Sequence, residues 1–150
     1  MNQEKIENFL KRYHLKHPLP VALTLLSVYF WATFLNRDFL KIIGAIINVA
    51  GLAMWWSAKL TLAGNWGVGF GKPGIKQLVT HGIYAKIRHP MYWGIILTLI
   101  GLVLIHPEIR FSIVSLLVII YFFSRMRRES KYLSEKLGEE YRDYVRKTWF

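Results

Sequence analysis

Four long stretches without an acidic or basic residue constrain the fold of this 150-residue chain more than any other feature. A helix that crosses a membrane needs about 20 mainly apolar residues, at a rise of about 1.5 Å each. We therefore predict an all-α, polytopic membrane protein with four transmembrane helices. The apolar stretches cover residues 19–35, 42–58, 91–105 and 111–123.

The last two stretches are short for a membrane span, so we expect their helices to extend into flanking residues. The third can extend over residues 84–89, and the fourth runs without a helix breaker into residues 124–147. Only residues 106–110 separate these two stretches, which predicts a tight helical hairpin.

The basic residues flank the apolar stretches and do not form one solvated face. The chain has 20 Lys plus Arg against 9 Asp plus Glu. Seventeen of the 20 lie in the N-terminal segment, the loop between the second and third stretches, and the C-terminal segment. The positive-inside rule therefore predicts a multi-pass integral membrane protein with both termini and the central loop in the cytoplasm.

Composition and charge distribution exclude some classes of function. A nucleic-acid-binding surface needs basic residues on one solvated face, so we predict no nucleic-acid partner. The chain contains no cysteine, which excludes a thiolate nucleophile and a Cys-bound metal. We predict no metal site.

Amphipathic segments are predicted at both ends of the chain. Residues 1–18 place apolar side chains at helical spacing, which is typical of an N-terminal helix lying on the membrane surface. The C-terminal segment predicts a cytosolic helix that lies on the membrane or on the central loop. We assign no chemistry to its apolar stripe, which consists of Leu133, Leu137, Tyr141 and Tyr144.

Small and polar residues recur at matching spacing in the second and third apolar stretches. Such stripes allow close approach of helix backbones in lipid, so we predict that these two helices touch. The residues are Gly44, Asn48 and Gly51 in one stretch and Gly94, Thr98 and Gly101 in the other.

The central loop carries the first candidate site. Its glycine-rich run over residues 64–74 lacks the strand and helix of a phosphate-binding loop, and a flexible linker is the better interpretation. Pro90 suits the first turn of a helix and is expected to leave the following amide N–H groups free. Beside Arg88 such a helix start attracts anions. His89 is either a hydrogen-bond donor, a base or a structural residue.

The second candidate site follows the fourth apolar stretch. Arg125 and Glu129 share one helix face, and an unpaired carboxylate at headgroup depth is costly, so we expect Glu129 to meet a cation. Together the two sites suit a zwitterionic cofactor with a fixed cation, such as S-adenosylmethionine. Its carboxylate would favour Arg88, and its sulfonium would favour Glu129 or the faces of Tyr84 and Tyr92.

Three linked motifs resemble the superfamily of isoprenylcysteine carboxyl methyltransferases and phospholipid methyltransferases. They are residues 78–84 (LVTHGIY), residues 88–94 (RHPMYWG), and Glu129 followed by Leu133, the LGEEY run over residues 137–141, and Tyr144. The resemblance covers roughly residues 60–147 of a single domain over residues 1–150. Ser130 stands where many members have a second glutamate.

The resemblance implies a membrane methyltransferase that uses S-adenosylmethionine in a pocket facing the cytosol. It implies a lipophilic or lipid-modified acceptor, with Arg125 and Glu129 at the reacting group, and leaves open whether the acceptor is a carboxylate or an amine. The implied cofactor contacts are Lys76, Gln77, Leu78, Val79, Tyr84, His89, Pro90, Met91 and Tyr92. The electrostatic argument above adds Arg88 to these contacts.

Two other functions stay open from the sequence. Sterol reductases share an Arg-His-Pro-x-Tyr-x-Gly element and bind NADPH in a membrane pocket, but commonly have Asn at the position of Met91 and are much longer. A non-catalytic four-span protein that holds anionic lipid would explain the charge and the spans. It would not explain why Arg88, His89 and Glu129 lie on one leaflet.

Overall fold

The computed structural model describes residues 18–34, 38–62 and 78–149. These residues form helices and connecting segments without a strand, which confirms the all-α prediction for this part of the chain. The predicted helix over residues 1–18 lies outside the described residues except for Pro18, and the glycine-rich loop lies wholly outside them. The elements are α2 (Pro18–Phe34), α3 (Phe39–Leu62), the 3-10 helix η2 (Gly82–Ala85), α4 (Pro90–Ile105), α5 (Ile109–Leu137) and α6 (Glu139–Lys147).

Two of these helices, α3 and α5, are long and apolar enough to cross a membrane. Shorter apolar helices cover Val21–Thr33 within α2 and Pro90–Ile105. The expected extension of α4 over residues 84–89 is wrong, because Pro90 has no amide hydrogen and begins the helix. The expected extension of α5 is confirmed as far as Leu137, but the expectation of no helix breaker through residue 147 is wrong, because Gly138 ends the helix.

The contact between α3 and α4 is confirmed at the residues that the sequence indicates. A Cβ atom added to Gly51 would lie 2.5 Å from the Thr98 nitrogen, and one added to Gly101 would lie 2.5 Å from the Gly44 oxygen. The two backbones therefore touch where no side chain separates them. Asn48 Nδ2 donates to the Thr98 carbonyl oxygen at 3.1 Å.

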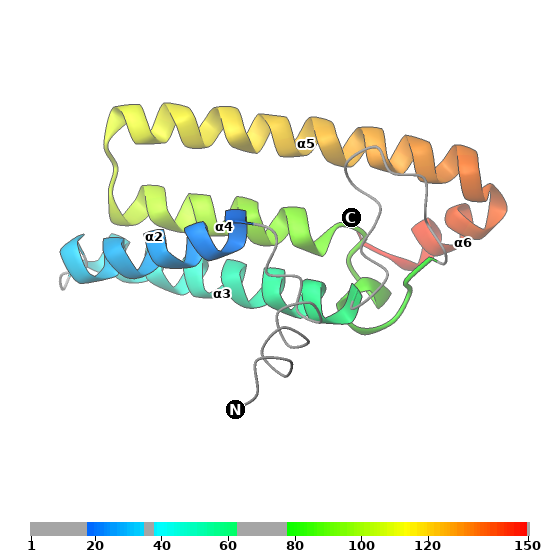
Figure 1. Ribbon diagram of the computed structural model, residues 1–150, viewed down its shortest axis with the longest axis horizontal. Coiled ribbons are helices and arrows are strands. Elements are labelled where there is room, and N and C mark those ends of the chain that lie inside the picture. The colour runs from blue at the N-terminus through cyan, green and yellow to red at the C-terminus, as the bar shows by residue number, and fades with distance from the viewer. Residues whose placement is uncertain (1–17, 35–37, 63–77, 150) are drawn as a thin grey trace, which may run out of the picture.

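Helices α2 to α5 run side by side in alternating directions (Figure 1). The tight hairpin between α4 and α5 is confirmed, with Glu108 Oε2 accepting a hydrogen bond from the Phe111 amide at 2.9 Å as the cap of α5. At the opposite end of the bundle, η2, the start of α4 and the last turns of α5 lie together with α6. This end contains the polar residues of the candidate site.

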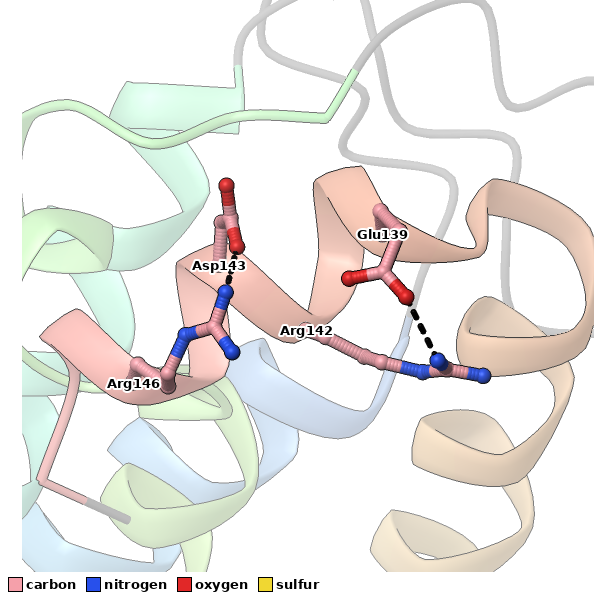
Figure 2. A network of polar contacts seen from close by, with 4 residues as sticks. All are labelled: Glu139, Arg142, Asp143 and Arg146. Atoms are coloured by element: carbon pink, nitrogen blue, oxygen red, sulfur yellow. Dashed lines mark hydrogen bonds and ion pairs between the residues drawn. The ribbon is translucent and has the colours of Figure 1, made fainter.

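A glycine ends α5 and redirects the chain into α6. Gly138 has a φ of +53°, a conformation that side chains disfavour, and α6 folds back from it toward η2. Figure 2 shows two ion pairs on α6, Glu139 with Arg142 and Asp143 with Arg146. All four side chains are more than half exposed, so these pairs add little stability.

The buried face of α6 is what attaches it to the bundle. Tyr141 and Tyr144 pack with Leu133 of α5 and with Leu78, which precedes η2. The predicted apolar stripe therefore covers the described end of the central loop.

Candidate functional site

The start of α4 supplies the first part of the site. His89 precedes Pro90 and makes no side-chain cap hydrogen bond to the helix. Its carbonyl oxygen accepts hydrogen bonds from the amides of Tyr92 and Trp93, both at 3.1 Å. The expectation of free amides after Pro90 is therefore wrong for these two residues, because the chain turns tightly enough for one carbonyl to bind both N–H groups.

The side chain of His89 instead reaches across to α5. Its Nε2 lies 2.7 Å from Ser130 Oγ, and only 9% of the residue is exposed. Burial, and then the charge of Arg88, lower the pKa of His89 from 6.5 to about 4. The imidazole is therefore neutral at neutral pH, and its bond to Ser130 is a hydrogen bond between uncharged groups.

A second contact between α4 and α5 lies one residue earlier on α5. The Tyr92 hydroxyl donates to Glu129 Oε2 at 2.6 Å. Arg125, one turn before Glu129, interacts electrostatically with both groups and supplies the cation expected beside this carboxylate. Tyrosine, carboxylate and guanidinium thus form one polar cluster at the end of the apolar bundle.

Tyr84 of η2 borders the same cluster. Burial, and then the nearby Glu129 carboxylate, raise the pKa of Tyr84 well above its usual value. The phenol therefore stays protonated at neutral pH, and its ring packs with Ala58 and Val79.

The structure brings together most of the described residues that the sequence singled out. Tyr84, His89, Tyr92, Arg125 and Glu129 lie in or beside the polar cluster. The remaining described candidates contribute apolar walls or lie next to the cluster: Val79 and Met91 pack with Ala58 of α3, Leu78 packs with Leu133, Pro90 is buried, and Arg88 lies beside His89. Lys76 and Gln77 lie outside the described residues.

Two residues of the site were not predicted from the sequence. Ser130 follows Glu129 directly, and its position next to a candidate carboxylate was the available signal. Tyr144 donates through its hydroxyl to the Tyr84 carbonyl oxygen at 2.8 Å, over 60 residues of sequence. Helical periodicity placed Tyr144 on an apolar stripe and gave no indication of this partner.

An unpartnered buried donor tests whether the site suits a carboxylate-bearing cofactor. Arg88 Nε is buried and has no hydrogen-bond partner within the described part of the chain. A ligand carboxylate would satisfy such a donor, whereas leaving it unpaired is costly. The Glu129 carboxylate, hydrogen-bonded to Tyr92 and near Tyr84, suits a ligand cation.

These features define a class: a helical protein with two membrane-length helices and a partly buried polar site at one end of the bundle. The sequence model of the phospholipid methyltransferase family matches residues 40–140, which is more than half of the chain. The chain belongs to this family. The resemblance noted from its three motifs is thereby confirmed.

Curated relatives agree with this assignment. A protein-S-isoprenylcysteine O-methyltransferase of Tribolium castaneum is 31% identical over 79% of this chain and 43% of its own length. A protein of the same name from Schizosaccharomyces pombe is 37% identical over 47% of this chain and 30% of its own. A probable protein-S-isoprenylcysteine O-methyltransferase from Oryza sativa subsp. indica is 33% identical over 47% of this chain and 38% of its own length. The chain spans less than half the length of these relatives.

The buried histidine predicts a pH-dependent stability. Its pKa of about 4 in the folded protein lies below the ordinary 6.5, so between these values the unfolded chain binds the proton and the folded chain does not. The stabilising contribution of neutral His89 to the free energy of unfolding is fully present above pH 6.5. It is lost as the pH falls toward 4, and the loss is on the order of 3 kcal/mol. Urea unfolding in detergent should show that acidification lowers the free energy of unfolding less in His89→Gln than in the wild type.

The matched control is His81→Gln, which replaces an exposed histidine before η2. We expect this variant to keep the acid dependence of the wild type. Equal slopes for His89→Gln and the wild type between pH 6.5 and 4 would contradict the assignment of a neutral, buried imidazole.

Proposed function

We propose that the protein is an integral membrane methyltransferase that moves the methyl group of S-adenosylmethionine to a lipophilic acceptor. The observation that carries this proposal is the pair of contacts between α4 and α5, Tyr92 with Glu129 and His89 with Ser130. They join residues 37 and 41 positions apart into one partly buried polar site in a chain of a methyltransferase family.

The reaction assigns separate tasks to the residues of this site. When bound, S-adenosylmethionine supplies a methyl group whose bond to sulfur breaks, with its electrons kept on sulfur, as the acceptor's electron pair forms the new bond. Arg88 would hold the cofactor carboxylate through its unpartnered Nε. Glu129, beside Tyr84 and Tyr92, would face the cation. Burial of these groups excludes water and fixes the reactants in line.

The apolar residues around the cluster complete the proposed cofactor site. Leu78, Val79 and Met91 belong to the two apolar groups that flank η2, and Pro90 fixes the start of α4. For Lys76 and Gln77 the proposal rests on the resemblance alone.

We place the site on the cytoplasmic side of a four-span bundle. The alternating directions of α2 to α5 support four spans, with α2 and α4 the shorter ones (Figure 1). The exposed basic residues Arg127, Arg128 and Lys131 follow the apolar part of α5 at the end that holds the site. By the positive-inside rule this end faces the cytosol, together with both chain termini.

For the acceptor we favour an oxygen nucleophile, such as the carboxylate of a lipid-modified molecule. The relatives are O-methyltransferases by name, and Arg125 suits a bidentate contact to a carboxylate. A carboxylate needs no base at neutral pH. An amine headgroup, the alternative that the family name favours, would require Glu129 to take or stabilise a proton.

Binding in lipid nanodiscs tests the cofactor. We expect saturable binding of S-adenosylhomocysteine, measured by calorimetry, and none of NADPH. Binding of NADPH alone would overturn the proposal in favour of a sterol-type reductase. Binding of neither would favour a non-catalytic four-span protein.

The pH dependence of methyl transfer tests the acceptor. Lipid extracts are incubated with methyl-labelled S-adenosylmethionine, and the labelled product is identified by mass spectrometry. A carboxylate acceptor predicts a rate that is flat from neutral to alkaline pH. A rate that rises through one ionisation would instead indicate an amine.

A further inference from the structure

The C-terminal segment holds the turn that leads into the site at two backbone positions. The Tyr144 hydroxyl donates to the Tyr84 carbonyl oxygen at 2.8 Å, and the Trp149 amide donates to the Lys86 carbonyl oxygen at 2.9 Å. The two acceptors flank Ala85 at the end of η2. The backbone just before Arg88 and His89 is therefore tied to α6 and the residues after it.

The position of Tyr144 is fixed by its own packing and hydrogen bonding. It is 7% exposed and packs with Leu133 and Tyr141, while Thr148 Oγ1 donates to its carbonyl oxygen at 3.1 Å. Burial raises the pKa of Tyr144 to about 12, so its hydroxyl remains a donor at neutral pH. Its hydrogen bond to Tyr84 is thus both buried and geometrically constrained.

The tied segment carries two of the proposed cofactor contacts. Tyr84 borders the cluster of Tyr92 and Glu129. Arg88 acts electrostatically on both His89 and Tyr144, so its charge lies near the start of α4 and near α6. A short 3-10 turn has few internal hydrogen bonds, so its conformation depends on external partners.

We propose that Tyr144 is a positioning residue for ligand binding, whose hydroxyl fixes the backbone of residues 84–88 so that Tyr84 and Arg88 face the site. This inference rests on the proposed function, because that function supplies the ligand. It gives a task to a residue that lies on another helix and outside the polar cluster.

The test compares Tyr144→Phe with Tyr141→Phe. Both variants remove one buried hydroxyl from α6, but the Tyr141 hydroxyl has no hydrogen-bond partner among the described residues. Loss of a buried hydrogen bond predicts that Tyr144→Phe raises the Kd of S-adenosylhomocysteine and the KM of S-adenosylmethionine by about 5- to 10-fold. We expect kcat to stay within about twofold, and Tyr141→Phe to leave all three values unchanged.

Hydrogen exchange gives a readout that needs no ligand. The amides of Tyr84, Lys86 and Ile87 donate within the turn, and we expect them to exchange about 5- to 10-fold faster in Tyr144→Phe only. The proposal would be overturned if Tyr144→Phe left both the exchange rates and the Kd unchanged. It would also be overturned if Tyr144→Phe and Tyr141→Phe weakened binding equally, or if Tyr144→Phe lowered kcat without changing KM. If the wild type binds no S-adenosylhomocysteine, the proposed function fails, while exchange still decides whether Tyr144 fixes the turn.

Discussion

Replacement of Glu129 by Gln is expected to lower kcat/KM for S-adenosylmethionine by about 100-fold or more while leaving the protein folded. Glutamine has the shape of glutamate and can still accept the hydrogen bond from Tyr92, so the contact between α4 and α5 is kept. What is lost is the negative charge that faces Arg125 and, in the proposed site, the ligand cation. Methyl transfer measures this effect, while binding of S-adenosylhomocysteine, which lacks the sulfonium cation, and thermal unfolding in detergent test whether the site and the fold are retained.

The control for this prediction lies on the same helix. Glu135→Gln removes the same charge from a side chain that is 66% exposed and forms only a weak pair with Lys131. We expect it to have the activity and melting temperature of the wild type. Normal turnover in Glu129→Gln would exclude this carboxylate from the chemistry, and a fall in melting temperature would assign it to folding.

The largest effect on stability is expected from Gly101→Val. A Cβ atom there would lie 2.5 Å from the Gly44 oxygen and 2.6 Å from the Asn48 nitrogen, both backbone atoms of α3. Rotation of a side chain cannot relieve such contacts, so the helices must separate. We expect a loss of about 3 kcal/mol or more in the free energy of unfolding, because overpacking against backbone exceeds the usual cost of a core insertion.

Ala50→Val is the matched control, since it adds two methyl groups to an exposed position of α3. Denaturant titration of both variants in one detergent should unfold Gly101→Val at a much lower concentration and leave Ala50→Val near the wild type. Similar midpoints for the two variants would show that α3 and α4 do not meet at their glycines.

The helical part of the fold was predictable because its signals are local. Four uncharged stretches correspond to α2, α3, α4 and the apolar part of α5, and the glycine stripes located the contact between α3 and α4. The start of α4 was expected in two places: the extension over residues 84–89 was wrong, whereas the placement of Pro90 in the first turn of a helix was correct, because proline can begin a helix but not continue one.

The composition of the site was easier to predict than its contacts. Tyr92, Arg125 and Glu129 were recognised as candidates, but their hydrogen bonding depends on how α4 and α5 are rotated about their axes. The pattern of apolar residues within one helix does not specify how that helix is rotated relative to its neighbour. The same reason hid the partners of Ser130 and Tyr144, which lie 41 and 60 residues from the groups they contact.

Helix α5 is continuous from Ile109 to Leu137, and this continuity couples the site to the surrounding lipid. Leu116, Leu117 and Ile120 are exposed on the same rod that carries Glu129 two to four turns further on. A stiff helix transmits any tilt of its lipid-facing half to its far end. We therefore expect the thickness of the bilayer to change the distance between the Glu129 carboxylate and the Tyr92 hydroxyl, and with it the reactivity of the site.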